Sequence, residues 1–318
     1  MKEKNCLIFG GSGQIGRHLI RKLTKNNYRV TVVTRNIHQK GHIIKTQGNA
    51  GYISIVEANI FDEIKIRKLF ENADICINLI GILYEKKPNQ FNLFHSDLPS
   101  LLSKLALKNS LEQFIHISAL GIENAKDSEY AKSKLSGEEH VRKNFSKAII
   151  LKPSIVYSVD DNFTTNFMSL LSNLPFMPLY YNGDTKFTPI HVSDFTNIIY
   201  EIIQKNITGE TIECIGPEIF TFKEMLIKIL KSINKKRLLF PLPLFLAKIS
   251  AKIFQLMPKP ILTIDQLKLL KYDNIISKKY KTNFDLNMNA NKKFENEISR
   301  YSFNWTSGGR FSKKNLIK

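Results

Sequence analysis

The sequence predicts an α/β fold: a doubly wound parallel sheet, with a smaller C-terminal α/β domain lying over the carboxyl edge of that sheet. Short apolar runs alternate with amphipathic stretches through the first half of the chain, a pattern typical of a parallel sheet covered by helices. The first apolar run, residues 5–9, leads through a glycine-rich turn into an amphipathic stretch. The 318 residues, 43% of them hydrophobic, are enough to bury a full core.

The periodicity gives an ordered series of elements. Apolar runs predict strands over 5–9, 30–33, 53–57, 75–79, 114–118 and 148–151. Amphipathic stretches between them predict helices over 14–25, 63–70, 98–109 and 130–144. Further on, we expect a strand and helix over 190–203, a helix over 222–233, and an apolar, proline-interrupted segment over 238–262. The predicted domains are 1–160, to which 186–206 returns, and a smaller substrate or partner domain over 161–318.

Composition argues against several classes of protein. The formal net charge is +19, but the lysines are scattered and no zinc-finger spacing, RNP-like motif or arginine-rich arm accompanies them, which disfavours nucleic-acid binding. The three cysteines are isolated, and neither they nor the seven histidines show metal-ligand spacing, so no metal site is predicted. No apolar run has the length of a membrane span and no secretory leader precedes the first strand, which predicts a cytoplasmic protein.

The glycine-rich turn carries the clearest functional signal. Its glycines fit both the G-x-x-G-x-x-G and the G-x-G-x-x-G spacing. Glycine permits the tight turn and the close approach of a pyrophosphate, while the N-terminus of the following helix supplies amide donors. The sequence therefore predicts a Rossmann-like dinucleotide site whose first contacts are Gly10, Gly11, Ser12, Gly13, Gln14, Ile15, Gly16 and Arg17. The alternative is a glycine turn that binds no ligand.

The end of the second predicted strand indicates which dinucleotide binds. Proteins that prefer NAD usually carry an acid there for the ribose 2'-hydroxyl, whereas this chain has Thr34 and Arg35. Arg35 can pair with a 2'-phosphate, and Arg17 beside the glycine turn is a second candidate. NADP(H) is therefore favoured over NAD(H). The alternative is that both arginines are solvated surface residues that bind no cofactor.

Two further loops fit the same site. Asn59 and Ile60 follow the third strand, where the adenine would lie, and Leu79 and Gly81 follow the fourth, where a small residue lets the cofactor pass. The alternative for each is an ordinary loop that binds no ligand. The order of these loops after the glycine turn favours a role in the dinucleotide site.

A possible reaction centre lies on the helix predicted over 130–144. Tyr130 and Lys134 are one helical turn apart and share a face. A tyrosine beside a lysine ammonium can pass a proton to or from a substrate oxygen, and Ser118, ending the fifth strand, is expected to hydrogen-bond that oxygen. The alternative is that Tyr130 and Lys134 only hold the ribose of a permanently bound dinucleotide.

With these motifs the chain resembles the atypical or extended short-chain dehydrogenase/reductase family, and within it the accessory NADPH-binding subunits of respiratory complex I and their bacterial relatives. The resemblance extends over nearly the whole chain. It rests on residues 10–16, 34–35, 116–121, 130–138 and 152–157, and on the more specific segments 161–163, 189–194, 262–266 and 308–310.

The resemblance implies a tightly bound NADPH and, in the mitochondrial relatives, a role in the assembly or stability of complex I. By the family pattern the cofactor contacts are Gly10, Gly13, Gly16, Arg35, Gly81, Tyr130 and Lys134. Pro153 and Ile155 are further expected cofactor contacts. Two positions depart from the pattern. Asn59 stands where an aspartate is frequent, which affects adenine recognition, and Ser158 stands where a glycine is frequent, which affects the loop above the nicotinamide.

Two hypotheses follow. In the first, the chain is an NADP(H)-binding accessory or assembly protein of NADH:quinone oxidoreductase. In the second, it is a free NADP-dependent reductase or epimerase that acts on a small oxygenated substrate through Ser118, Tyr130 and Lys134. The apolar segment around 240–257 is either a core helix of the smaller domain or a surface helix that meets a partner subunit or the inner face of a membrane.

Overall fold

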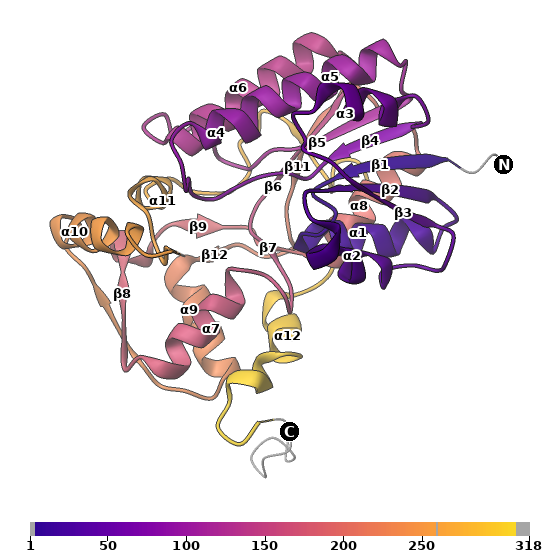
Figure 1. The fold of residues 1–318 in the computed structure, drawn as a ribbon. Helices are drawn as coiled ribbons and strands as arrows, with labels where there is room; N and C mark the ends of the chain where they lie inside the picture. The colour runs from indigo at the N-terminus through magenta and orange to yellow at the C-terminus, as the bar shows by residue number, and fades with distance from the viewer. Residues whose placement is uncertain (1–3, 259, 310–318) are drawn as a thin grey trace.

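A computed structural model describes residues 4–258 and 260–309 (Figure 1). Across these residues eight strands form one sheet in the order β14-β11-β6-β5-β4-β1-β2-β3, with every neighbouring pair parallel. Its strands are β1 (Asn5–Phe9), β2 (Arg29–Thr34), β3 (Ile53–Glu57), β4 (Ile75–Asn78), β5 (Gln113–Ile117), β6 (Ile149–Pro153), β11 (Thr211–Cys214) and β14 (Lys281–Thr282). The predicted doubly wound α/β fold is confirmed.

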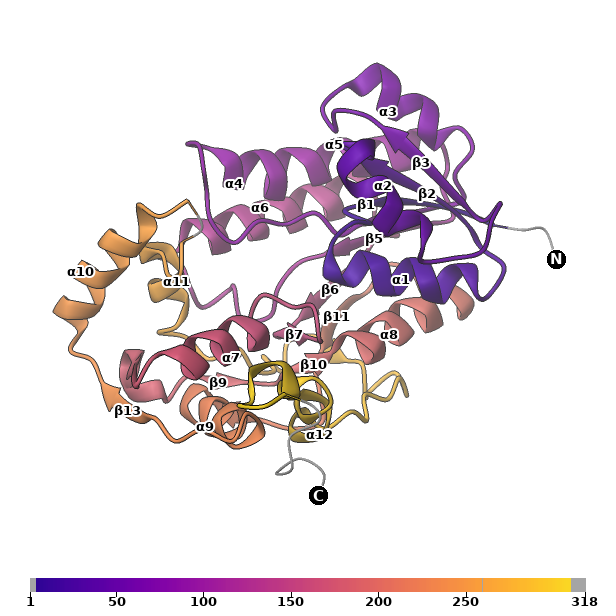
Figure 2. The ribbon, with the colours of Figure 1, turned by 60° about the horizontal axis from the view of Figure 1, so that its bottom comes forward.

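Helices cover both faces of this sheet (Figures 1 and 2). One face carries α1 (Gln14–Thr24), α2 (Ile37–Lys45) and α8 (Val192–Gln204), whose apolar side chains share a core with the sheet. The other carries α3 (Glu63–Phe70), α5 (Leu98–Lys108) and α6 (Glu129–Asn144). A short α4 (Gln90–Asn92) and a π-helical turn (Leu93–Asp97) lead into α5. Apolar runs thus become central strands because helices shield them on both sides.

A smaller layer lies at the carboxyl edge of the sheet, at the lower left of Figure 1. Its helices are α7 (Thr164–Asn173), α9 (Phe222–Ser232), α10 (Leu244–Gln255), α11 (Ile264–Leu269) and α12 (Phe294–Ser299), with 3₁₀ turns at Tyr180–Gly183 and Ser302–Trp305. Its strand pairs are β7 (Val156–Tyr157) with β10 (Ile190–His191), β8 (Phe176–Leu179) with β13 (Leu238–Pro241), and β9 (Lys186–Phe187) with β12 (Phe220–Thr221). One apolar cluster around Tyr157 and Phe222 and a smaller one under α10 and α11, which includes Ala251 and Leu267, hold this layer together.

The predicted elements of the first half are present, and those of β1, β3 and α3 have the predicted bounds. The sheet also takes two strands from beyond residue 206, β11 and β14, which periodicity did not reveal because they are only four and two residues long. Helix α2 was likewise missed, since Gly41 and two histidines weaken its apolar pattern. Of the segment 308–310, Arg310 lies outside the described residues.

Helix α6 lies against the π-helical turn so closely that one position must be glycine. A Cβ built on Gly137 would stand 1.8 Å from the carbonyl oxygen of His95, which is backbone and cannot rotate away. The contact matters for function because α6 carries Tyr130 and Lys134.

We therefore expect Gly137→Ala to lower the free energy of unfolding by about 2 kcal/mol or more, because the helix must move away from its neighbour. Urea denaturation monitored by circular dichroism measures the change. The control is Gly41→Ala in α2, where the new methyl meets only side-chain atoms, those of Ile37 and Ile55; it should change stability by no more than ~1 kcal/mol. Equal effects of the two substitutions would contradict the proposed clash.

Candidate dinucleotide site

The glycine turn lies where the order of the sheet reverses. The chain leaves β1 toward β2 on one side and returns with β4 on the other, which places a crevice at the carboxyl end of β1. Gly10 has φ +84°, a conformation that side chains disfavour, and a Cβ on Gly16 would come within 2.5 Å of the Gly11 Cα. Gly13 begins α1 without a side-chain cap, so the first-turn amides are left for a ligand. These features fit a pyrophosphate.

Loops from β4 close the crevice beside this turn. The Leu79 amide donates to the carbonyl of Phe9 at 2.9 Å, and a Cβ on Gly10 would stand 3.0 Å from the Leu79 carbonyl carbon. Gly81 follows, and a side chain there would begin 3.4 Å from the Lys134 ammonium nitrogen. The structure therefore brings the predicted Leu79, Gly81 and Lys134 together at one edge.

At the end of β2, Arg35 is exposed, and no ion pair with another described residue engages its guanidinium. The acid nearest in the sheet register is Glu57, opposite Thr34 in β3. Its carboxylate accepts the amide of Ile37 at 2.8 Å, the first residue of α2. The positive end of that helix therefore offsets the Glu57 charge, and Arg35 is left free to meet an anion.

Arg17 has a different partner from the one predicted. Its guanidinium pairs with the carboxylate of Asp160 at 2.5 Å, and His18 stands 3.7 Å from the same group. Burial by itself raises the pKa of the Asp160 carboxyl, but hydrogen bonds from His18 and Ser158 and the Arg17 charge outweigh it and lower that pKa to about 2. The side-chain amide of Gln14 also donates to the Ser158 hydroxyl at 3.0 Å. Arg17 and Gln14 thus tie the loop after β7 to the glycine-turn helix.

Tyr130 and Lys134 lie on one face of α6, as predicted. The buried Lys134 ammonium donates to the carbonyl of Ile117 at 3.0 Å, and burial lowers its pKa to about 8 despite the opposing charge of Glu138. The Tyr130 ring meets those of Phe91 and His95 edge-on, with centroids 5.8 and 5.2 Å away. Burial, followed by the charge of Asp265, raises the pKa of Tyr130 to about 12. The phenol is therefore protonated near neutral pH.

Ser118 lies outside this arrangement. It is 4% exposed, and its hydroxyl donates to the Glu138 carboxylate at 2.5 Å. That carboxylate also accepts from Lys152 at 2.8 Å and from Arg142 at 2.9 Å. The Ser118 proton is committed to this buried network, so the structure does not offer it to a substrate oxygen.

The structure adds two residues that the sequence analysis missed. Asp265 in α11 accepts the amides of Glu129 and Tyr130 at 2.8 and 3.0 Å and the Ser128 hydroxyl at 2.7 Å. Its carboxylate therefore caps α6 from 135 residues away along the chain. The Thr263 to Gln266 capping box does predict the start of α11 from sequence, but not its target.

The second missed residue is His95, which is buried between Tyr130 and Lys134. It accepts the Ile82 amide at Nε2, 3.0 Å away, and its Nδ1 lies 3.0 Å from the Ser133 hydroxyl, which itself donates to the Tyr130 carbonyl. These partners assign the proton to Nδ1. Burial and the nearby Lys134 charge lower the pKa of His95 to about 2, so the ring is neutral.

The other predicted cofactor contacts lie around the crevice, farther from the glycine turn. The Asn59 side chain accepts the Phe61 amide at 3.1 Å and shapes the loop after β3, where Ile60 is buried. Pro153 ends β6, and Ile155 packs onto the core of the smaller layer. His/Cys/Asp/Glu groups capable of holding a metal do not occur among residues 4–258 and 260–309.

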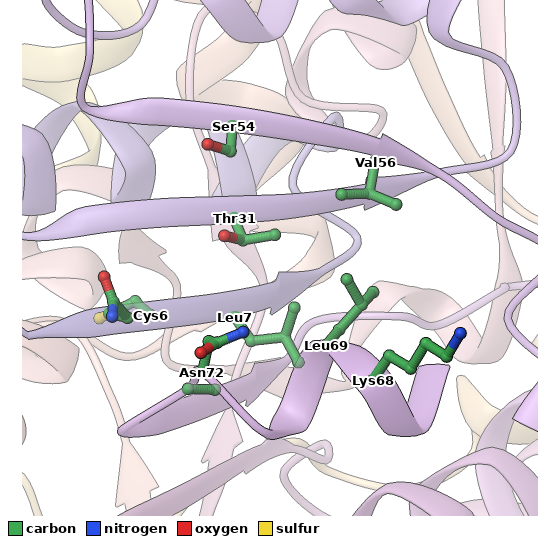
Figure 3. A pocket seen from close by; sticks show the side chains of 10 residues that line it. Cys6, Leu7, Thr31, Ser54, Val56, Lys68, Leu69 and Asn72 are labelled. Carbon is green, nitrogen blue, oxygen red and sulfur yellow. The ribbon is translucent and has the colours of Figure 1, made fainter. Parts of the chain in front are cut away.

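A hollow elsewhere on the sheet is not part of this site. Figure 3 shows it between α3 and the strands β1, β2 and β3. Thr31, Ser54 and Leu69 line it, and Lys68 is its one charged lining residue. It includes Asn5 and Cys6 at the start of β1, whereas the glycine turn follows the end of that strand. Its lining offers no chemistry for a dinucleotide.

Curated relatives match most of the chain. The NADH-ubiquinone oxidoreductase 40 kDa subunit of Neurospora crassa is 26% identical over 88% of this chain and 74% of its own length. The NADH dehydrogenase [ubiquinone] 1 alpha subcomplex subunit 9 of Arabidopsis thaliana is 26% identical over 85% of this chain and 70% of its own. These similarities confirm the predicted resemblance to complex I accessory subunits.

Solved structures and a family model agree on the fold. A dTDP-glucose 4,6-dehydratase from Bacillus anthracis superposes with a TM-score of 0.71 at 14% identity, covering 95% of this chain and 96% of that one. A UDP-glucose 4-epimerase from Thermotoga maritima gives a TM-score of 0.68 at 16% identity, covering 93% and 98%. Residues 6–215 match the model of the NAD dependent epimerase/dehydratase family. With the glycine turn, the sheet order and this match in agreement, the chain belongs to the NAD dependent epimerase/dehydratase family.

Proposed function

We propose that this chain is an NADP(H)-binding accessory or assembly subunit of a respiratory NADH:quinone oxidoreductase, complex I, and that it holds its cofactor without turning it over. The observation that carries the proposal is the state of Ser118, whose hydroxyl is committed to Glu138 while Tyr130 and Lys134 remain beside the crevice. Such a site retains the groups that bind a ribose and lacks the one that orients a substrate oxygen. Relatives named as complex I subunits support the same conclusion.

In this proposal each group of residues has a binding role. The α1 amides meet the pyrophosphate, Arg35 pairs with the 2'-phosphate, and Tyr130 with Lys134 holds the nicotinamide ribose. NADPH supplies a transferable hydride when bound. Tyr130, Leu269 and Tyr272 all pack onto the small apolar cluster of Ile122, Ala125 and Ala131. The Arg17 to Asp160 ion pair keeps the loop after β7 against the glycine turn.

A second candidate is a free NADP-dependent reductase or epimerase. The Tyr130 and Lys134 spacing favours it, because that pair is the proton-transfer part of the predicted triad. The chain is also similar in sequence to a Ceramide reductase of Caulobacter vibrioides, which is 26% identical over 59% of this chain and 57% of its own length. This candidate requires another group to replace Ser118 in orienting the substrate.

We propose a cytoplasmic location at the inner face of the membrane. The three cysteines are free and buried, as a reducing compartment allows. No helix in the described part of the chain has the length and apolarity to cross a bilayer.

The two functions predict different native assemblies. If the chain is an accessory subunit, it should comigrate with in-gel NADH dehydrogenase activity when detergent-solubilised membranes from the source cell are separated on native gels. Immunodetection after the gel measures this, with the cytosolic fraction as control. A species of monomer size found only in the cytosol contradicts the accessory role, and screening of small carbonyl substrates for NADPH oxidation then tests the second candidate.

The choice of cofactor depends on Arg35. We expect Arg35→Gln to weaken NADPH binding by roughly 10- to 100-fold, since a charge-assisted pair with the 2'-phosphate is lost, and to leave NADH binding nearly unchanged. Isothermal titration with each dinucleotide measures both affinities. Lys40→Gln, an exposed cation on α2, is the matched control and should alter neither by more than about twofold. If Arg35→Gln lowered the affinities for NADPH and NADH equally, Arg35 would not be the residue that pairs with the 2'-phosphate.

Lys134 should destabilise the cofactor-free protein. Its pKa falls from 10.5 in the unfolded chain to about 8 in the fold, so the cost of burying the charge is fully present below pH 8 and disappears as pH rises toward 10.5. At pH 7, Lys134→Met should therefore be more stable by about 1–3 kcal/mol, and bind NADPH more weakly. Urea titrations at pH 7 and pH 10 without cofactor measure this, with exposed Lys104→Met as control. A stability gain that persists unchanged at pH 10 contradicts the charge argument.

A further inference from the structure

Helix α10 has an unusual distribution of side-chain sizes. Its small residues, Ala247 and Ala251, are fully buried against the protein. The 3.6-residue repeat puts larger apolar side chains on the opposite side, where Phe245, Ile249 and Leu256 are 64%, 52% and 86% exposed. A helix that only covers a core has the reverse pattern, with its large apolar residues inward.

We call the exposed side, made by Phe245, Ile249, Ile253 and Leu256, the α10 apolar face. Both views place α10 at the periphery of the molecule, with no other helix or strand of the described residues on its outer side (Figures 1 and 2). Leu246 and Met257, 41% and 44% exposed, extend the exposed apolar surface at the margin opposite the lysines. Contiguous apolar surface of this kind marks an interaction site in soluble proteins.

The charges around this face indicate what it meets. Residues 235–264 contain six lysines or arginines and no acid. Two of them, Lys248 and Lys252, are exposed on α10 itself, along one margin of the apolar face. Their long side chains can lie along an apolar surface while the ammonium groups reach a polar layer above it. The face is therefore complementary to a partner that is apolar inside and negatively charged at its surface.

We propose that the α10 apolar face docks onto the surface of a bilayer containing anionic phospholipid, with α10 lying in the plane of the membrane. Phe245, Ile249 and Leu256 enter the interface between headgroups and acyl chains, and Lys248 and Lys252 meet lipid phosphates. A second copy of the chain fits less well, because face-to-face docking brings the same lysines together in a protein of net charge +19. This docking does not depend on cofactor binding.

The test is flotation of the purified full chain with vesicles. We expect it to float with vesicles of equal parts phosphatidylcholine and phosphatidylglycerol, to remain behind with phosphatidylcholine alone, and to be released by high salt. Lys248→Gln with Lys252→Gln should weaken binding roughly 25-fold, about fivefold for each cation. Phe245→Gln with Ile249→Gln should weaken it at least about tenfold, since two apolar anchors are lost.

Matched controls separate docking from general effects. Lys104→Gln with Lys108→Gln removes two exposed lysines of α5, and Ile64→Gln with Leu107→Gln removes two apolar residues that are 76% and 59% exposed. Both control pairs should float like the parent, and all variants should keep its thermal midpoint. Equal flotation with both lipid compositions overturns the charge complementarity. Absence of flotation overturns the proposal, and a dimer lost in Phe245→Gln with Ile249→Gln would assign the face to a second copy.

Discussion

The carboxylate of Asp265 at the N-terminus of α6 is the interaction on which the geometry of the site depends. The first amides of a helix have no partners within it. The Ser128 hydroxyl accepts a hydrogen bond from the amide of Ala131, and the Asp265 carboxylate accepts from the amides of Glu129 and Tyr130. A negative charge there also opposes the positive end of the helix dipole. Because Tyr130 belongs to the first turn, the C-terminal segment fixes where the Tyr130 and Lys134 side chains begin.

A second constraint lies beneath the same helix. Glu138 and Lys152 are 1% and 0% exposed, and such charges are tolerated in a core only when they are paired and hydrogen-bonded. Lys152 also reaches the carboxylate of Glu123, and Arg142 and Ser118 complete the set around Glu138. Freeing the Ser118 hydroxyl for a substrate would leave a buried carboxylate with one donor fewer. The network therefore stabilises the helix and engages the Ser118 hydroxyl at the same time.

The parts of this arrangement that follow local rules were predictable from sequence. The glycine turn, the ends of β1 and β3 and the one-turn spacing of Tyr130 and Lys134 all depend on neighbours within a few residues. The interactions of Ser118, Arg17 and Asp265 could not be predicted in this way. Their partners, Glu138, Asp160 and the α6 amides, lie 20 to 143 residues away in sequence, and only the fold decides which polar group reaches which. The short strand β14 joins the sheet for the same reason: pairing with β11 compensates for its weak pattern.

The segment from α10 to Tyr272 contributes both to the position of Tyr130 and to the exposed apolar surface of the chain. On its inner side, Leu269 and Tyr272 pack onto the same small apolar cluster as Tyr130, and Asp265 caps the helix that carries Tyr130. On its outer side it presents Phe245, Ile249 and Leu256. An enzyme that moved this segment to exchange substrate would also move Asp265 and with it the cap of α6, whereas a subunit held at a surface by α10 benefits from a segment that stays in place. If a dinucleotide binds beside Tyr130 as proposed, it acts as a structural ligand as well, since whatever binds the folded chain alone adds to its stability.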